Sequence, residues 1–166
     1  MRPAAGDIIR AKVYKTTHFG IFFQYAEHYL LVLIPETSWT SCYASCDQLA
    51  KPGDEFDIVV IHDVGDGRFA ASLKAMHPES DPWSGAWKVS VGDRITAKVA
   101  RVVDAADRCN GGKGYLLELK PAAYAMLCTE VSFKLQKGQL CEVVVTQVDD
   151  SRQAIHVQLV QSSSAR

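Results

Sequence analysis

The sequence has 166 residues, of which 48% are hydrophobic and 22% are charged, and its formal net charge is −1. This composition is typical of an ordinary globular protein that is long enough for two small domains, each with its own core. It excludes a strongly basic surface, so any nucleic-acid site has to be a local patch that relies on aromatic stacking. No run of about 18 apolar residues is present, so we expect no membrane partner.

The N-terminus and the cysteines favour a cytoplasmic protein. Residues 1–7 (MRPAAGD) lack the apolar stretch of a signal peptide. Five cysteines, an odd number, are scattered without a disulfide framework, so we expect reduced thiols. Cys42 and Cys46 share a face if their segment is helical, but zinc needs two more ligands, and His28 and His62 are too scattered to identify a site. We therefore predict no metal site and no cofactor.

The chain repeats itself. Residues 6–13 (GDIIRAKV) recur as residues 92–99 (GDRITAKV), 86 positions later, and residues 53–60 (GDEFDIVV) match residues 138–145 (GQLCEVVV), 85 positions later. Two landmarks that keep the same spacing indicate duplicated modules.

We place the first module at residues 1–80 and the second at residues 81–166. The boundary lies in residues 77–85 (HPESDPWSG), where two prolines and several polar residues make a poor strand. Trp83 and Trp87 are expected to pack this connection against a domain, which predicts a short linker.

Each landmark is a glycine turn followed by an alternating or β-branched run, the pattern of a strand. The first run is expected to alternate, with one face formed by Ile9, Ala11 and Val13 and the other by Arg10, Lys12 and Tyr14. Asp66 and Gly67 predict a tight hairpin turn, and residues 149–151 predict its counterpart.

These turns divide each module into about five short strands, with one helical piece near residues 38–49. Five antiparallel strands in about 75 residues predict a small closed barrel, with the OB-fold as the leading candidate and an SH3-like barrel as the alternative. The predicted fold class is all-β, with two tandem five-stranded OB-fold barrels joined by a short linker.

The stretch at residues 18–23 (HFGIFF) contains the candidate binding residues. A bulge or kink at Gly20 would bring Phe19 and Phe22 to the same outer face. Two exposed rings there would form a stacking platform worth about 1–3 kcal/mol per base. The alternative is that both rings belong to the core, where Phe23 is expected in either case.

The first half resembles the RNA-binding repeat of the ribosomal protein S-one family, a group of OB-folds. The matching elements, over roughly residues 5–83, are residues 6–13, the Phe-Gly-x-Phe element at residues 19–22, the glycine and aspartate at residues 53–54, Arg68 leading to residues 72–74 (SLK), and the closing residues 81–83 (DPW). The resemblance implies that Phe19, Phe22, Asp63 and Arg68 form an RNA face. The family also uses a histidine on its third strand, where this chain has Leu33.

Alternatives stay open for these side chains. Arg68 is suited to bind phosphate or to stack on a base, or it pairs with Asp63 or Asp66 on the surface. Asp63 holds the arginine, accepts from a base edge, or only caps a turn. Further phosphate contacts are assigned, with plain solvation as the alternative, to Lys12, Lys15 and Lys74.

The second half is a degenerate copy. Residues 110–119 (NGGKGYLLEL) replace the Phe-Gly-x-Phe element and lack both rings. Its glycines predict an ordinary hairpin loop or a basic loop that touches a nucleic-acid backbone, and they do not match the spacing of a P-loop. We expect this module to pack on the first one or to contact another partner.

The sequence thus predicts a non-catalytic module that binds single-stranded RNA or ribosome-associated RNA, in translation or RNA metabolism. No catalytic set of residues occurs at a telling spacing, so we do not expect an enzyme. The alternative is a protein-interaction or assembly module without RNA binding. It is favoured by the near-zero net charge, by Leu33, and by the apolar and aromatic residues 25–29.

Overall fold

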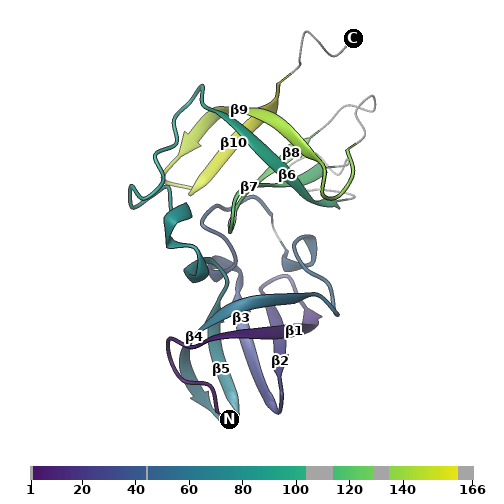
Figure 1. The fold of residues 1–166 in the computed structure, drawn as a ribbon, viewed down its shortest axis with the longest axis vertical. Helices are drawn as coiled ribbons and strands as arrows, with labels where there is room; N and C mark the ends of the chain where they lie inside the picture. The colour runs from purple at the N-terminus through teal and green to yellow at the C-terminus, as the bar shows by residue number, and fades with distance from the viewer. Residues whose placement is uncertain (1, 44, 104–113, 129–134, 161–166) are drawn as a thin grey trace.

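The computed structural model describes residues 2–43, 45–103, 114–128 and 135–160, and within them the chain forms two five-stranded sheets (Figure 1). The strands of the first sheet are β1 (Ile8–Thr16), β2 (Gly20–Tyr25), β3 (His28–Leu33), β4 (Glu55–Gly65) and β5 (Arg68–Ser72). The strands of the second are β6 (Arg94–Val103), β7 (Gly114–Lys120), β8 (Ala123–Cys128), β9 (Leu140–Asp149) and β10 (Ala154–Leu159). Short 3₁₀ turns complete the described elements: η1 (Ile34–Glu36), η2 (Cys46–Gln48), η3 (Lys74–Met76) and η4 (Pro78–Ser80).

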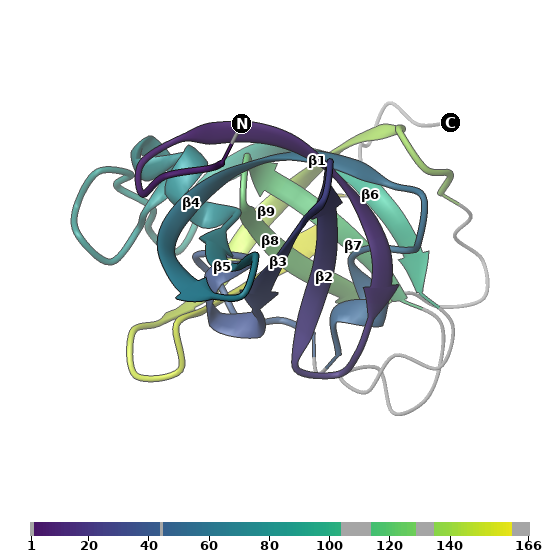
Figure 2. The same ribbon diagram turned by 90° about the horizontal axis from the view of Figure 1, so that it is seen from below.

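The first sheet closes into a barrel with the strand order β1-β2-β3-β5-β4 (Figure 2). Its ladders are antiparallel except for the one between β3 and β5, which closes the barrel with parallel strands. Along β1, Ala11 and Val13 are buried inside, whereas Lys12 and Tyr14 are exposed outside. The alternation predicted for this strand is confirmed.

The turn between β4 and β5 is the predicted hairpin. Asp66 and Gly67 have φ values of 56° and 74°. Two successive residues in the left-handed region are the requirement of a type I′ turn, which aspartate and glycine tolerate best. The carbonyl of Gly67 also accepts the N–H of Tyr29 at 2.9 Å, so the turn helps to close the barrel.

The second sheet has the order β10-β9-β6-β7-β8, so each of its strands has a counterpart in the same relative place in the first. The repeated landmarks meet in the same way: the N–H of Gly6 donates to the carbonyl of Val60 at 2.7 Å, and that of Gly92 to the carbonyl of Val145 at 2.8 Å. Among the described residues, no ladder joins β8 to β10 as β3 joins β5. The fold is all-β, with one closed five-stranded barrel and one barrel-like five-stranded sheet of the same strand order, which agrees with the prediction of two OB-folds.

The helix predicted near residues 38–49 is wrong, because the described part of this segment contains only the 3₁₀ turn η2. The Oγ of Ser38 accepts the N–H of Thr40 at 3.0 Å, and the N–H of Trp39 donates to the carbonyl of Ala122 at 2.8 Å. Serine and threonine hydroxyls compete with helical hydrogen bonding. Here the backbone of Trp39 bonds to the turn between β7 and β8, a distant contact that local sequence does not reveal.

The connection between the sheets is held by tryptophans. The Nε1 of Trp83 donates to the carbonyl of Trp39, whose own Nε1 donates to the carbonyl of His77 at 2.8 Å. Trp83 and Trp87 both pack against the core of the second sheet, which confirms the packing predicted for them. The division at residue 80 stays a prediction, since the buried cluster that fills the first barrel extends into the second sheet.

None of the helices in the described residues is long and apolar enough to cross a membrane.

Candidate nucleic-acid interface

Phe19 and Phe22 lie together on the outside of the first barrel. Their ring centroids are 6.0 Å apart, with an interplanar angle of 83°. Phe19, just before β2, is 42% exposed, and Phe22, within β2, is half-buried. Phe23 points the other way and is completely buried, as predicted. The alternative that Phe19 and Phe22 both belong to the core is therefore wrong.

A turn before β2, and not a bulge at Gly20, brings the two rings together. The N–H of Thr17 donates to the carbonyl of Gly20 at 2.9 Å, which folds the chain back just ahead of the strand. From Gly20 onwards β2 pairs regularly with β3. The register shift lies instead in β1, between Val13 and Lys15.

The rings continue into a longer strip. Tyr14 lies 6.1 Å from Phe22, Tyr29 lies 5.5 Å from Tyr14, and His18 lies 5.4 Å from Phe19, all between ring centroids. Tyr14 and Tyr29 are each 43% exposed. We refer to His18, Phe19, Phe22, Tyr14 and Tyr29 as the aromatic strip.

Sequence reasoning did not assign Tyr14 and Tyr29 to a site. The outward position of Tyr14 on β1 was a usable signal, because it follows from the alternation of the strand. The place of Tyr29 beside Tyr14 depends on how β1, β2 and β3 curve into the barrel, and short-range pattern does not contain that information.

A groove of about 520 Å³ opens beside the strip. Its lining consists of Tyr14, Phe22, Tyr29, Leu30, Leu31, Val64, Arg68 and Phe69. Arg68 is exposed at the start of β5, and its Cα is paired with that of Tyr29 in β3. Within the part of the chain that the structure describes, no ion pair engages Arg68, so the predicted alternative of a pair with Asp63 or Asp66 is not found.

Asp63 has other partners. Its carboxylate forms an ion pair with Arg2 and accepts the N–H of Gly65 at 2.8 Å, so it caps the turn after β4, which was one of the alternatives left open. The hydrogen bond from Arg2 and the one from Gly65 hold the pKa of Asp63 below its usual value. The Arg2 guanidinium also lies 5.5 Å from the ring centroid of Phe69, which lines the groove.

The three lysines predicted to contact phosphate do not all lie at the aromatic strip. Lys15 reaches the strip, with its ammonium 5.4 Å from the ring centroid of Phe22. Lys12 is exposed on β1, two residues before Tyr14. Lys74 is not brought to this surface, because its ammonium lies 4.8 Å from the ring centroid of Trp39.

Leu33, which stands where the resemblance implies a histidine, is exposed beside the strip. Its Cα is paired with that of Gly20, and the next residue, Ile34, donates its N–H to the carbonyl of Phe19 at 2.8 Å. Leu33 therefore lies near the rings, and its apolar side chain offers no hydrogen bond.

The second sheet has no comparable aromatic surface on the described part of β7. At the position of Phe22 it carries Leu116, which is completely buried. The glycine-rich loop predicted at residues 110–113 lies outside the described residues.

The cysteines offer little chemistry. Cys42 and Cys46 are both buried, and burial, helped by Asp47, raises the pKa of the Cys46 thiol to about 12. A thiol with such a pKa stays protonated and is a poor nucleophile or ligand. No group of three or more His, Cys, Asp or Glu side chains suited to a metal ion occurs among the described residues.

Cys128 is disulfide-bonded, which corrects the expectation that all thiols are reduced. The scattered spacing of the cysteines in the sequence does not show which of them meet in space.

No family model matches the chain. It is 26% identical over 160 residues to the small ribosomal subunit protein bS1 of Pseudomonas aeruginosa and 25% identical over 160 residues to that of Neisseria meningitidis. Both matches cover 94% of this chain but only 28% of the relative, so the chain spans little more than a quarter of the length of these proteins.

Among solved structures the chain is similar to GSP13 from Bacillus subtilis, with 24% identity and a TM-score of 0.42 over 54% of this chain and 74% of that one. The match to bS1 runs through both five-stranded sheets, and together with their strand order it supports a likeness of the chain to S1 OB-fold repeats.

Proposed function

We propose that the chain binds single-stranded RNA, without catalysis, through the aromatic strip and Arg68 of the first barrel. The observation that carries the proposal is the run of exposed and half-buried rings beside a groove lined by Arg68, which has no ion pair among the described residues. Bases of any sequence stack on such rings, and each stacked base contributes about 1–3 kcal/mol.

The charges nearby suit a nucleic-acid backbone. Lys15 and Arg68 lie at the strip and the groove, where both are close enough to bind phosphates of a strand whose bases stack on the rings. Lys12 and Asp63 lie farther out, and we propose a phosphate contact for the first and a supporting role at the edge of the groove for the second. Because the net charge is −1, stacking has to supply most of the affinity.

The names of the relatives support a role in translation or RNA metabolism. Both are named as proteins of the small ribosomal subunit, so we propose a cytoplasmic role on RNA in translation or RNA metabolism, with RNA or ribosome-associated RNA as the partner. The proposal concerns this chain, whose match covers 28% of each relative.

Fluorescence anisotropy tests the proposal. The chain is titrated into a labelled single-stranded RNA and into the matching DNA at two salt concentrations. We expect binding that weakens with salt and that is lost in the double variant Phe19→Ala/Phe22→Ala, while circular dichroism and thermal unfolding stay close to those of the parent protein. Leu140→Ala removes an exposed apolar side chain of the second sheet and serves as the matched control.

Unchanged affinity in the double variant would refute the aromatic strip as the site. No binding to either strand at low salt would instead favour a protein-interaction module. Leu33, 47% exposed beside Phe19, is the observation that favours this second function. A protein partner that is captured in the presence of RNase and lost on Leu33→Asp would establish it.

A further inference from the structure

The two sheets place side chains in equivalent positions, because the register of β6 with β7 repeats that of β1 with β2. In both sheets the pairing shifts by one residue at the same point of the first strand. Directly beyond the shift, Lys15 pairs with Phe22 in the first sheet, and Arg101 pairs with Leu116 in the second. On the next strand of each sheet, Tyr29 in β3 corresponds to Tyr124 in β8, because the two tyrosines pair with equivalent positions of β2 and β7.

The equivalent positions differ in burial. Tyr29 is 43% exposed, whereas Tyr124 is 9% exposed, and Leu116 is completely buried whereas its counterpart Phe22 is half-buried. Leu116 and Tyr124 both belong to the buried cluster that fills the first barrel. The face of the second sheet that corresponds to the aromatic strip is therefore turned towards the first module.

The segment that covers this face is the β3–β4 connection, residues 34–54, which the structure describes except for residue 44. The ring centroids of Tyr43 and Tyr124 are 6.4 Å apart. The N–H of Tyr124 donates to the Oγ1 of Thr40 at 2.8 Å, and the same hydroxyl donates to the carbonyl of Tyr124. The N–H of Ser41 donates to the carbonyl of Gln153 at 2.8 Å, so backbone as well as side chains hold the segment in place.

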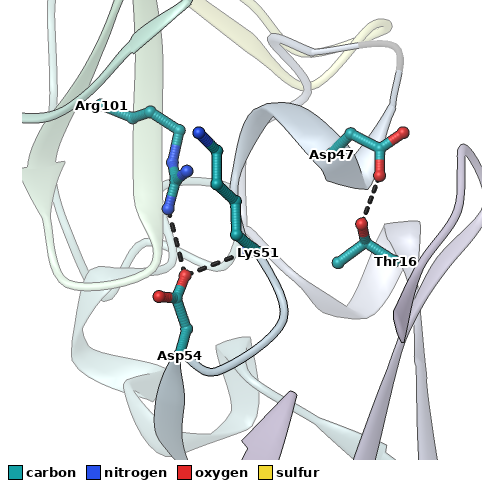
Figure 3. A network of polar contacts seen from close by, with 5 residues as sticks. All are labelled: Thr16, Asp47, Lys51, Asp54 and Arg101. Carbon is teal, nitrogen blue, oxygen red and sulfur yellow. Dashed lines mark hydrogen bonds and ion pairs between the residues drawn. The ribbon is translucent and has the colours of Figure 1, made fainter. Parts of the chain in front are cut away.

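An ion pair closes the contact (Figure 3). The guanidinium of Arg101 lies 3.1 Å from the carboxylate of Asp54, and the same carboxylate oxygen accepts the N–H of Lys51 at 2.9 Å. The Arg101 side chain is 13% exposed, so this pair is shielded from solvent to a degree that the surface pairs of the chain are not. Its counterpart Lys15 instead lies over the ring of Phe22 on the open strip.

We infer that the second barrel has its ligand face occupied by the β3–β4 connection of the first barrel. The same face of the repeat thus has two uses: in the first copy it is open to RNA, and in the second it docks a segment of its own chain. The two barrels form one unit that presents a single RNA face, so the chain binds one strand segment and not two. The statements about RNA rest on the proposed function; the docking of the segment does not.

Amide hydrogen exchange measures the docking without any RNA. The N–H groups of Trp39 and Ser41 donate to the carbonyls of Ala122 and Gln153, in the β7–β8 and β9–β10 turns of the second module, so their exchange reports directly on the contact. We expect both to be protected in the parent protein. Arg101→Glu, which sets like charges against each other at Asp54, should accelerate their exchange by about tenfold or more, since breaking a shielded ion pair leaves an unpaired charge.

Two variants make the result specific. Arg94→Glu removes an exposed ion pair with Glu142 on the same sheet and should leave Trp39 and Ser41 as protected as in the parent protein. The charge swap Arg101→Asp/Asp54→Arg should restore most of the protection. Amides of the β1–β2 ladder report whether a variant has unfolded altogether. Fast exchange of Trp39 and Ser41 in the parent protein, or unchanged exchange in Arg101→Glu with no effect of the swap, would overturn the docking.

Calorimetry with a short oligouridylate tests the stoichiometry. We expect one site per chain in the parent protein. Two sites, the second abolished by a substitution at Leu116 or Tyr124, would overturn the inference. No heat at all would count against the proposed function only, because the exchange measurement stands by itself.

Discussion

Tyr29 and Arg68 are direct partners across the β3–β5 ladder, the parallel seam at which the first sheet closes into a barrel. Closure therefore sets a guanidinium beside an exposed ring, although the two residues are far apart in the sequence. Both side chains line the same groove. Each nucleotide of a single strand presents one phosphate and one base. A cationic side chain next to an aromatic ring can bind both.

Replacing Arg68 should change the salt dependence of RNA binding. If Arg68 binds one phosphate of a single strand, Arg68→Ala should lower the affinity and reduce the slope of log affinity against log salt by about 0.7. Arg68→Lys should keep the slope and recover only part of the affinity, because a lysine does not reproduce the planar fork. Anisotropy titrations at several salt concentrations measure both quantities.

Arg10→Ala is the control for this prediction, because Arg10 already pairs with Glu55 and Asp57 on the outer face of β1 and β4. A slope that stays the same in Arg68→Ala, or that falls equally in Arg10→Ala, would contradict a phosphate contact at Arg68.

Tyr14 and Tyr29 should each contribute to RNA binding. Truncating either to alanine removes one ring from the strip, and we expect the dissociation constant to rise by roughly 5- to 150-fold, the equivalent of one stacked base. Tyr14→Phe and Tyr29→Phe retain the ring and should bind within a few-fold of the parent protein. If the alanine variants bind as tightly as the phenylalanine ones, the site ends at Phe22.

Gly20 should be required for both stability and binding. A Cβ at this position would lie 2.8 Å from Cδ1 of Leu31 and 3.0 Å from the carbonyl oxygen of Val32. Gly20→Ala is expected to lower the free energy of unfolding by about 1–3 kcal/mol, as in other overpacked sites. Urea denaturation measures the loss. RNA affinity should also fall, since Leu31 lines the groove.

Gly53→Ala separates the two effects. Gly53 has a φ of +98°, and a Cβ added there would meet no described atom within 4 Å, so alanine strains only the backbone. We expect lower stability and unchanged RNA affinity. Equal losses of affinity in both glycine variants would mean that general destabilisation, and not the shape of the groove, weakens binding.

The Arg2–Asp63 ion pair should release in acid. Because the pKa of Asp63 is lowered in the folded protein, the contact is fully present above the ordinary pKa of an aspartate and is lost as the pH falls through the depressed value. The amide shift of Gly65, whose N–H donates to Asp63, reports this titration by NMR. Arg2→Ala should move its midpoint upwards. A midpoint that is identical in the parent protein and in Arg2→Ala would exclude the pair in solution.

The sequence predicted most of the topology because its signals are local. The glycine landmarks at Gly6 and Gly92 mark turns that start equivalent strands, and Asp66 with Gly67 requires a hairpin. The prediction of a helix around Trp39 was wrong, because the hydrogen-bond partners of this segment lie in distant turns of the second module.

The site was predictable only in part for the same reason. Phe19 and Phe22 adjoin one turn and were predicted from the glycine between them and from the family resemblance, whereas Tyr29 joins the strip only through barrel curvature. The ion pair of Asp63 with Arg2 joins residues 61 positions apart, and nothing in the local pattern pointed to it.

The central claim, that RNA lies along the aromatic strip, is tested most directly by NMR mapping. The isotopically labelled chain is titrated with a single-stranded oligouridylate, and the amide shift changes are assigned to strands. We predict that the largest changes fall on β2, β3 and the start of β5, around Phe22, Tyr29 and Arg68. Binding whose shift changes fall on other surfaces and spare these strands would contradict the account.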